Sequence, residues 1–176
     1  MKKFLTISAA LGLLAACGLT PDPDSKSSSG NGSSNTDVTK PCVGSISWSS
    51  GSPPPPYSSR WTLVLSADGA KASFSHGPSY GEKPTFEAKD FSVDARKSGE
   101  LCKALRDIPG ELNPKVGGPT MGWKVTGASG SATDNFDPAY RAALEIIGSQ
   151  RLDEAKSKFS QWADEYKKSR EASPHT

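Results

Sequence analysis

The chain has 176 residues, of which 34% are hydrophobic and 23% charged, and this length suits one small globular domain with a short appended segment. Its formal net charge of +2 comes from Lys2 and Lys3, because the rest of the chain is formally neutral. A neutral chain lacks the concentrated basic charge of nucleic-acid-binding proteins, so we exclude that class.

The first seventeen residues have the parts of a bacterial export signal. The two lysines precede an uncharged run of eleven residues, 4–14, whereas a membrane-spanning helix needs about 20 residues. The motif "LAAC", residues 14–17, begins at the last residue of this run and resembles the lipobox of bacterial lipoproteins. The resemblance implies removal of residues 1–16, a diacylglycerol on the thiol of Cys17 and usually an acyl chain on the new amine. The alternative is an ordinary signal peptide that is cut elsewhere.

A lipidated Cys17 would anchor the protein stably, because two or more acyl chains hold a protein at a membrane. Gly18 stands where lipoproteins kept at the Gram-negative inner membrane often carry Asp. The resemblance therefore implies the periplasmic face of the outer membrane in a Gram-negative host. Residues 17–41 are rich in Ser, Gly, Asn and Pro and cannot bury enough apolar surface to fold, which predicts a disordered tether.

Residues 42–169 have a mixed composition that predicts a single domain, and residues 170–176 are expected to be a disordered tail. The domain contains Cys42 and Cys102. Paired cysteines of exported proteins usually form disulfides, so we expect one bridge between them; two free buried thiols are the alternative.

The first half of the domain shows strand patterns. "SISWSS", residues 45–50, alternates apolar and polar side chains and predicts a strand. The proline run 53–56 favours an extended polyproline helix. Residues 60–74 predict a hairpin that turns at Asp68-Gly69, with Trp61, Leu63 and Leu65 on one face. Residues 84–93 predict one further strand or two short pieces.

The second half contains helices. Leucine spacing predicts a helix over residues 97–107, and period two then returns around Trp123, with "GASG" at 127–130 as a turn. Residues 137–148 predict a helix capped by Asp137, and residues 152–168 a last helix with an apolar, core-facing stripe. The members of this stripe are Leu152, Ala155, Phe159, Trp162 and Tyr166. The order predicts an α+β fold: a mainly antiparallel sheet with about three helices packed on one face, stapled by one disulfide.

No catalytic constellation is evident in the sequence. His76 lies in the turn-like "SHGPSYG", where a surface position is expected. No cluster has zinc-ligand spacing, and Asp134 and Asp137 lack the remainder of a calcium loop, so capping is expected of Asp137. We therefore expect no enzyme activity, no cofactor and no metal.

Two features could carry binding instead. The proline run would form a stiff, exposed loop beside Tyr57, unless it is only a spacer between strands. Trp48 stands between serines and could be exposed, whereas Trp61 and Trp123 are expected in the core. The candidate binding residues are therefore Pro53, Pro54, Pro55, Pro56, Tyr57 and Trp48.

These features favour a lipid-anchored, non-catalytic lipoprotein of the cell envelope that binds another protein. The partner would be an envelope hydrolase that it inhibits or confers immunity against, or an assembly component. "SISWSSG", "TLVLSADG" and "LCKALRD" are loosely similar to small bacterial inhibitors of thermolysin-type metallopeptidases, and no inhibitory residue transfers. The alternatives are binding of peptidoglycan or another glycan through Trp48, Tyr57 or Tyr80, and an enzyme of unfamiliar type that uses His76 with a carboxylate.

Overall fold

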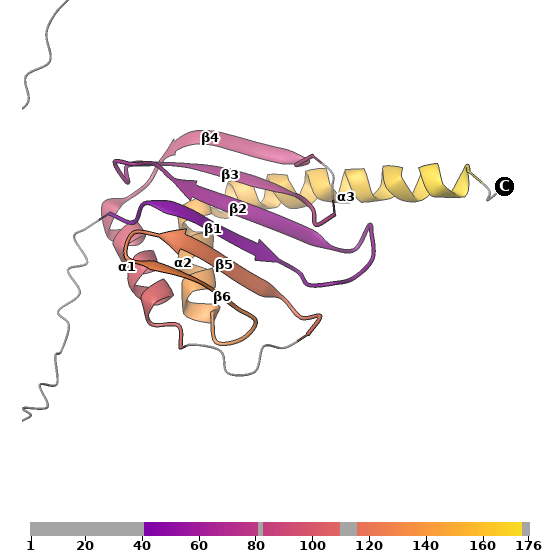
Figure 1. Ribbon diagram of the computed structural model, residues 1–176. Coiled ribbons are helices and arrows are strands. Elements are labelled where there is room, and N and C mark those ends of the chain that lie inside the picture. The colour runs from indigo at the N-terminus through magenta and orange to yellow at the C-terminus, as the bar shows by residue number, and fades with distance from the viewer. Residues whose placement is uncertain (1–40, 81–82, 110–115, 174–176) are drawn as a thin grey trace, which may run out of the picture. The chain divides into compact units, whose positions relative to one another are not determined.

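The computed structural model describes residues 41–80, 83–109 and 116–173. The predicted lipobox, with Cys17 and nearly all of the tether, lies outside these residues. The described part contains a six-stranded antiparallel sheet in the order β4-β3-β2-β1-β5-β6, with three helices on one of its faces (Figure 1). The predicted α+β class is confirmed.

The strands are β1 (Gly44–Ser49), β2 (Ser59–Leu65), β3 (Lys71–Pro78), β4 (Phe86–Ser92), β5 (Thr120–Val125) and β6 (Ala128–Ala132). The helices are α1 (Ala95–Arg106), α2 (Asp137–Ile147) and α3 (Ser149–Glu171). β1 lies inside the sheet and pairs with β2 on one side and β5 on the other. The predicted hairpin 60–74 corresponds to β2 and β3, although β3 runs on to Pro78. For residues 84–93, the first alternative, one strand, holds as β4.

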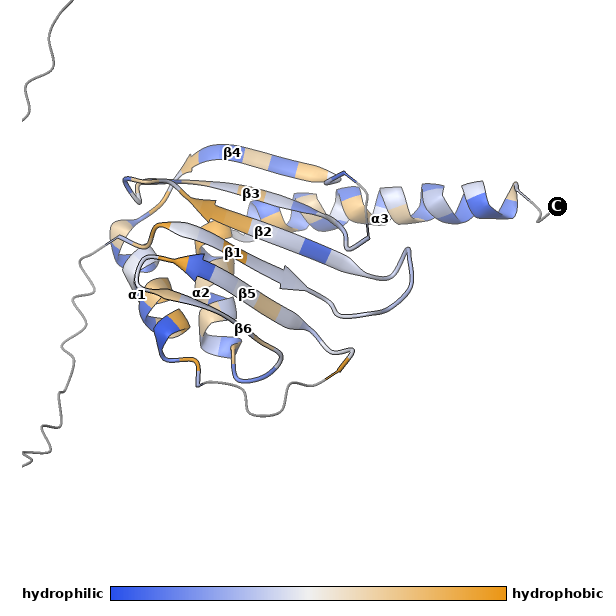
Figure 2. Ribbon diagram, viewed as in Figure 1, coloured by the Kyte–Doolittle hydropathy of each residue, from blue (hydrophilic) through white to orange (hydrophobic). Residues whose placement is uncertain are grey.

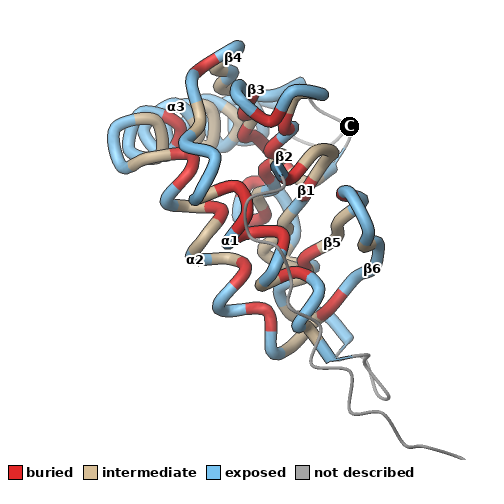
Figure 3. The backbone as a smooth tube through the Cα atoms, turned by 90° about the vertical axis from the view of Figure 1, so that its left-hand side faces the viewer, coloured by how far each residue is buried: buried red, intermediate tan, exposed pale blue. Residues whose placement is uncertain are grey.

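The core lies between the sheet and the helices. Across the sheet, Ile46 of β1 pairs with Leu63 of β2 and with Trp123 of β5, and Leu63 pairs with Phe74 of β3, so these side chains share the inner face. Figure 2 shows hydrophobic stretches of β1, β2 and β5 beside α1 and α2, and Figure 3 shows buried positions where sheet and helices face each other. Period two in the strands therefore produces one apolar layer.

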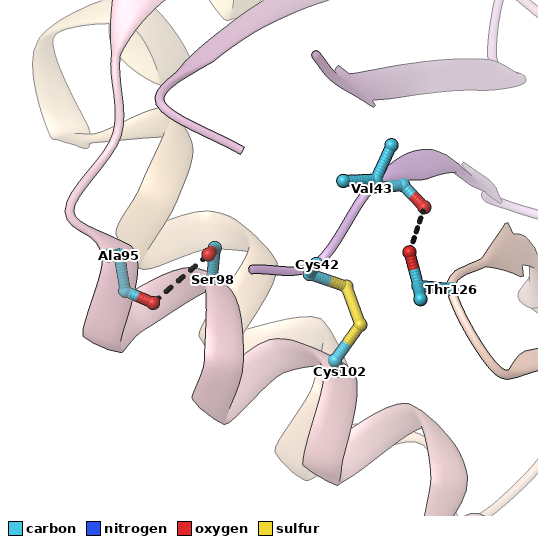
Figure 4. The surroundings of a disulfide bond; sticks show 6 residues. All are labelled: Cys42, Val43, Ala95, Ser98, Cys102 and Thr126. Carbon is cyan, nitrogen blue, oxygen red and sulfur yellow. Dashed lines mark hydrogen bonds between the residues drawn. A yellow bond between two sulfur atoms is a disulfide. The ribbon is translucent and has the colours of Figure 1, made fainter. Parts of the chain in front are cut away.

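One disulfide joins the segment before β1 to α1, as predicted. Cys42 and Cys102 are both buried, with sulfurs 2.02 Å apart (Figure 4). The next residue, Val43, accepts hydrogen bonds at its carbonyl from the backbone N–H (2.9 Å) and the hydroxyl (3.3 Å) of Thr126. The segment that leads into β1, residues 42–43, is thus bonded both to α1 and to the β5–β6 turn.

The helix α1 begins where its first N–H groups find an acceptor. The carboxylate of Asp94 accepts from the backbone N–H of Arg96 (2.8 Å) and of Lys97 (3.2 Å), which satisfies two donors that have no intrahelical partner. The helix buries Leu101 and Leu105, the two leucines on which its prediction rested.

The turn predicted at "GASG", residues 127–130, lies one residue earlier and is shorter than predicted, and it includes only Gly127 of the four. The chain turns at Thr126-Gly127, where Gly127 has φ 74°, and residues 128–130 belong to β6. Gly130 serves a different purpose, because a Cβ there would lie 2.7 Å from the ring of Trp123 on the paired strand. Glycine at position 130 leaves room for the indole of Trp123. In the sequence, a glycine that serves this purpose cannot be distinguished from a glycine that marks a turn.

The predicted capping role of Asp137 is wrong. Phe136 occupies the N-cap position of α2 without a side-chain cap bond, and Asp137 is the first helical residue. Its carboxylate still lies in the first turn, where negative charge interacts favourably with the helix dipole. At the other end of the chain, α3 continues to Glu171, past the predicted domain boundary at residue 169.

Removing the disulfide should lower the free energy of unfolding. The bridge spans 60 residues, and the chain-entropy model gives about 4 kcal/mol for a loop of that size. We expect Cys42→Ser/Cys102→Ser to lose about 3–4 kcal/mol in urea denaturation. Adding reductant should weaken the parent chain by a similar amount and leave the variant unchanged. A loss below about 1 kcal/mol would contradict this account.

Candidate functional site

A cavity of about 220 Å³ lies between the inner face of the sheet and the helices α2 and α3. Its wall is largely apolar and aromatic. The lining residues are Trp48, Ser59, Trp61, Phe74, His76, Tyr140, Leu144, Leu152, Ala155, Lys156 and Phe159. Strands supply one side of the wall and helices the other, so its shape depends on how the two layers meet.

The strand register places three rings in one row. Trp48 of β1 pairs with Trp61 of β2, which pairs with His76 of β3, so all three side chains project from the inner face. The two indoles are stacked, with centroids 6.3 Å apart and planes 17° from parallel. The expectation that His76 lies at the surface is wrong: its exposed fraction is 9%. β3 runs on to Pro78, and period two carries the inward face from Phe74 to His76.

Tyr140 of α2 closes the cavity over the indoles. Its ring centroid lies 5.6 Å from that of Trp48 and 6.0 Å from that of Trp61. Burial raises the pKa of the Tyr140 phenol, and a hydrogen bond from the Trp61 side chain partly offsets the increase. The phenol is therefore neutral near pH 7 and remains a hydrogen-bond donor.

Burial favours the neutral form of the His76 imidazole. Desolvation lowers its pKa from the ordinary value of 6.5, a hydrogen bond with the backbone of Ala155 opposes this, and the charge of Lys156 lowers it further. The Nδ1 atom is buried and has no hydrogen-bond partner. A neutral imidazole has one nitrogen that accepts a hydrogen bond, and a buried polar atom left unpaired costs about 1–3 kcal/mol.

From the cavity, aromatic rings continue along α3. His76 contacts Phe159 edge-on at 5.3 Å between centroids, Phe159 lies 5.4 Å from Trp162, and Trp162 lies 5.4 Å from Tyr166. Spacings of three and four residues keep these three α3 rings on one side of the helix. We call Phe159, Trp162 and Tyr166 the aromatic stripe.

The prediction that this side of α3 faces the core holds only for the first part of the helix. Ala155 is buried, whereas the three rings of the aromatic stripe are half-buried. The end of α3 extends past the ends of the strands (Figure 1), so the sheet does not cover it.

The proline run forms a turn against the end of α3. The N–H of Tyr57 donates to the carbonyl of Pro54 at 3.0 Å, and the Pro55–Pro56 peptide is cis, so the run is not the extended polyproline helix expected from the sequence. Pro54 and Pro55 are exposed, Pro53 is half-buried and Pro56 is buried. The ring of Tyr57 is 65% exposed, and the Nζ of Lys167 lies 5.3 Å from its centroid.

Two open grooves flank the aromatic stripe. One, of about 500 Å³, lies between the proline turn and α3 and is lined by Pro55, Pro56, Tyr57, Tyr166, Lys167, Arg170 and Glu171. The other, of about 570 Å³, lies between the segment before β4 and α3 and is lined by Lys83, Pro84, Thr85, Lys158, Gln161, Trp162 and Glu165. Among the candidate residues, the structure thus brings Pro55, Pro56 and Tyr57 to α3 and places Trp48 in the cavity.

The site residues on α3 were present in the sequence as an apolar stripe, and their spacing was the signal that could have identified them. His76 and Tyr140 gave no such signal, because their role depends on the helices crossing β1, β2 and β3. Within the described ranges, no group of three or more His, Cys, Asp or Glu side chains could hold a metal ion.

No family model matches the chain, and neither the curated proteins nor the solved structures include a match. In the part of the chain that the structure describes, no helix is both long and apolar enough to span a bilayer.

The buried histidine should make stability depend on pH. Because the folded-state pKa of His76 is below 6.5, the unfolded chain takes up this proton first as the pH falls, and the free energy of unfolding falls below about pH 6.5. We expect His76→Gln to lose this dependence. Urea denaturation of both proteins at pH 7.5 and 5.5 measures it, and the parent should lose more stability than the variant. An equal loss in the two proteins would contradict a depressed pKa.

Proposed function

We propose that this chain is a lipid-anchored protein of the bacterial envelope whose domain binds another protein and does not catalyse a reaction. The lipobox-like "LAAC" supports the anchor. The surface made by the proline turn and the aromatic stripe supports the binding role.

The half-buried rings of the stripe are the observation that carries the binding proposal. Trp162 and Tyr166 are held by the backbone of a 23-residue helix, and Tyr57, on a hydrogen-bonded turn, lines the same groove as Tyr166. Large rings held on rigid elements lose little entropy when they dock, and Trp and Tyr are the residues that most often dominate binding energy at protein interfaces.

The charge around the stripe indicates the kind of partner. The two grooves contain four basic side chains, Lys83, Lys158, Lys167 and Arg170, against two acidic ones, Glu165 and Glu171, and Asp164 beside the grooves pairs with Lys167 at 3.9 Å, which leaves an excess of one positive charge. This local excess stands out because the chain after Lys3 is formally neutral. Complementary potentials speed association and select partners, so we propose a partner whose contact segment is acidic and carries an apolar anchor.

The finer form of the proposal is that the partner is an envelope hydrolase, which this domain inhibits. The likeness of "SISWSSG", "TLVLSADG" and "LCKALRD" to small metallopeptidase inhibitors supports it. In the other form of the proposal, the partner is a component of an envelope assembly.

A second candidate function is glycan binding, which one further observation favours. Tyr57 and Tyr80 are 65% and 49% exposed, and the N–H of Ser79 donates to the carbonyl of Ser58 at 3.3 Å. This bond brings the two tyrosines to the same end of the sheet, where exposed rings could stack on sugars.

The anchor has a direct test. Cys17→Ala removes the only thiol that the lipobox reading allows to be acylated, so we expect loss of labelling by a clickable fatty acid and release from washed membranes. Cys42→Ser/Cys102→Ser is the matched control, which should still be labelled. Retention of Cys17→Ala in the membrane after a high-salt wash would contradict the lipid anchor.

The binding surface is tested by affinity capture from solubilised envelopes with the full lipidated chain. We expect one stoichiometric protein in the eluate, and Trp162→Ala/Tyr166→Ala should reduce its recovery at least about tenfold, the loss of a pair of interface anchors. Val64→Ala is the control, because Val64 is 45% exposed on the opposite face of the sheet. Equal recovery of the captured protein by Trp162→Ala/Tyr166→Ala and by Val64→Ala would contradict the proposed binding surface. Capture of peptidoglycan fragments without protein would favour the glycan alternative if Tyr57→Ala/Tyr80→Ala loses that capture.

A further inference from the structure

We propose that the cavity beneath Trp48 and Trp61 is a binding site for one small aromatic ring that carries a hydrogen-bond donor, a phenol or an indole. This inference goes beyond the proposed function and does not depend on it, because the site lies in the inner layer of the domain. The same ring chemistry could come from a free molecule or from a tyrosine or tryptophan side chain of a partner.

The size of the cavity selects a single or fused ring. Its volume of about 220 Å³ exceeds the roughly 150 Å³ of an engineered apolar cavity that binds benzene. It is smaller than the roughly 300–1,000 Å³ of pockets for drug-sized ligands. A ring of six to nine atoms with one polar substituent fits between these limits.

The wall is built for a flat apolar body. Stacked Trp48 and Trp61 form one side, and Tyr140 lies within 6.0 Å of both centroids. Leu144 and Leu152, which are both half-buried, complete the apolar part of the wall. Aromatic surfaces at these separations favour offset-stacked and edge-to-face partners, which gives a ring an advantage over an alkyl chain of the same volume.

His76 supplies the reason for a donor on the ligand. Its imidazole lines the cavity, and its buried Nδ1 has no hydrogen-bond partner in the folded protein. In the unliganded fold this Nδ1 has essentially no accessible surface, so the imidazole has to turn toward the cavity before an O–H or N–H brought in on a ring can pair with it. Such unpaired polar groups give strong selectivity against analogues that lack the matching group.

The cavity has a route to solvent. Lys156 in its wall is exposed, and Ser59, Trp48 and Phe159 are half-buried. Phe159 is also the first ring of the aromatic stripe, so a bound ring would contact the residue where the binding surface on α3 begins.

The test uses the chain from residue 17 with Cys17→Ala, which needs no detergent that would absorb the probes. Phenol and indole are titrated by calorimetry and by tryptophan fluorescence, against anisole and 1-methylindole, which have similar shapes but no donor. We expect saturable one-to-one binding of the donors and about fivefold to tenfold weaker binding of the methylated analogues. No saturable binding of any ring up to about 10 mM, or equal binding of each pair, would overturn the proposal.

Two variants locate the site. His76→Phe keeps a ring against Phe159 and removes the acceptor. The affinity for phenol should therefore fall to the affinity for anisole, and the affinity for anisole should not change. Leu144→Trp should fill the cavity and abolish the binding of both phenol and anisole. Val64→Ala should leave the affinity for each of them unchanged. Near-ultraviolet circular dichroism shows whether each variant is folded. If Leu144→Trp does not fold, His76→Phe still decides, because an unchanged preference for phenol in that variant would overturn the role of His76.

The source of the ring is read from the same titration. Binding of N-acetyltyrosinamide with an affinity near that of phenol would support the site and assign the ring to a side chain. Binding of phenol with exclusion of the amide would support the site and assign it to a free molecule.

Discussion

The antiparallel register of β1, β2 and β3 is the constraint on which the rest of this structure depends. It places Trp48, Trp61 and His76 side by side on the inner face of the sheet. A shift of one residue in either pairing would turn one of these rings to the outer face and expose the apolar residues beside it. Exposing that apolar layer would cost free energy, and this cost fixes the register of the strands. The same register holds both the core and the cavity wall in place.

The disulfide acts on the same constraint from outside the sheet. Cys42 precedes β1 by only two residues, and its bond to Cys102 fixes the start of the central strand against α1. The hydrogen bonds between Val43 and Thr126 hold the same segment to the β5–β6 turn. The strand whose register matters most is thus held at its entry by a covalent bond and by two hydrogen bonds.

The length of α3 accounts for the second site. A helix of 23 residues is about 35 Å long, whereas the eight residues of β3 span about 26 Å. The helix therefore extends past the end of the sheet. Its apolar side is buried in the core at Ala155 and only half-buried at Tyr166. One continuous sequence stripe thereby serves packing at one end and binding at the other, and Phe159 belongs to both.

The sequence by itself determined the local elements: the strand around Ile46, the hairpin through Asp68-Gly69, the helix carrying Leu101 and Leu105, and the pairing of Cys42 with Cys102. Periodicity and cysteine chemistry suffice for these, because each depends on neighbours along the chain or on a single available partner. The local reading failed where one residue type has two uses, as with Gly130, which clears space for Trp123, and with His76, whose turn-like neighbours Gly77 and Pro78 end a strand. Only the tertiary structure decided that Trp48 faces a cavity, that Tyr140 closes it and that the proline turn lies against α3. These depend on how the helices cross the sheet, and that geometry results from packing between layers distant in sequence rather than from any local pattern.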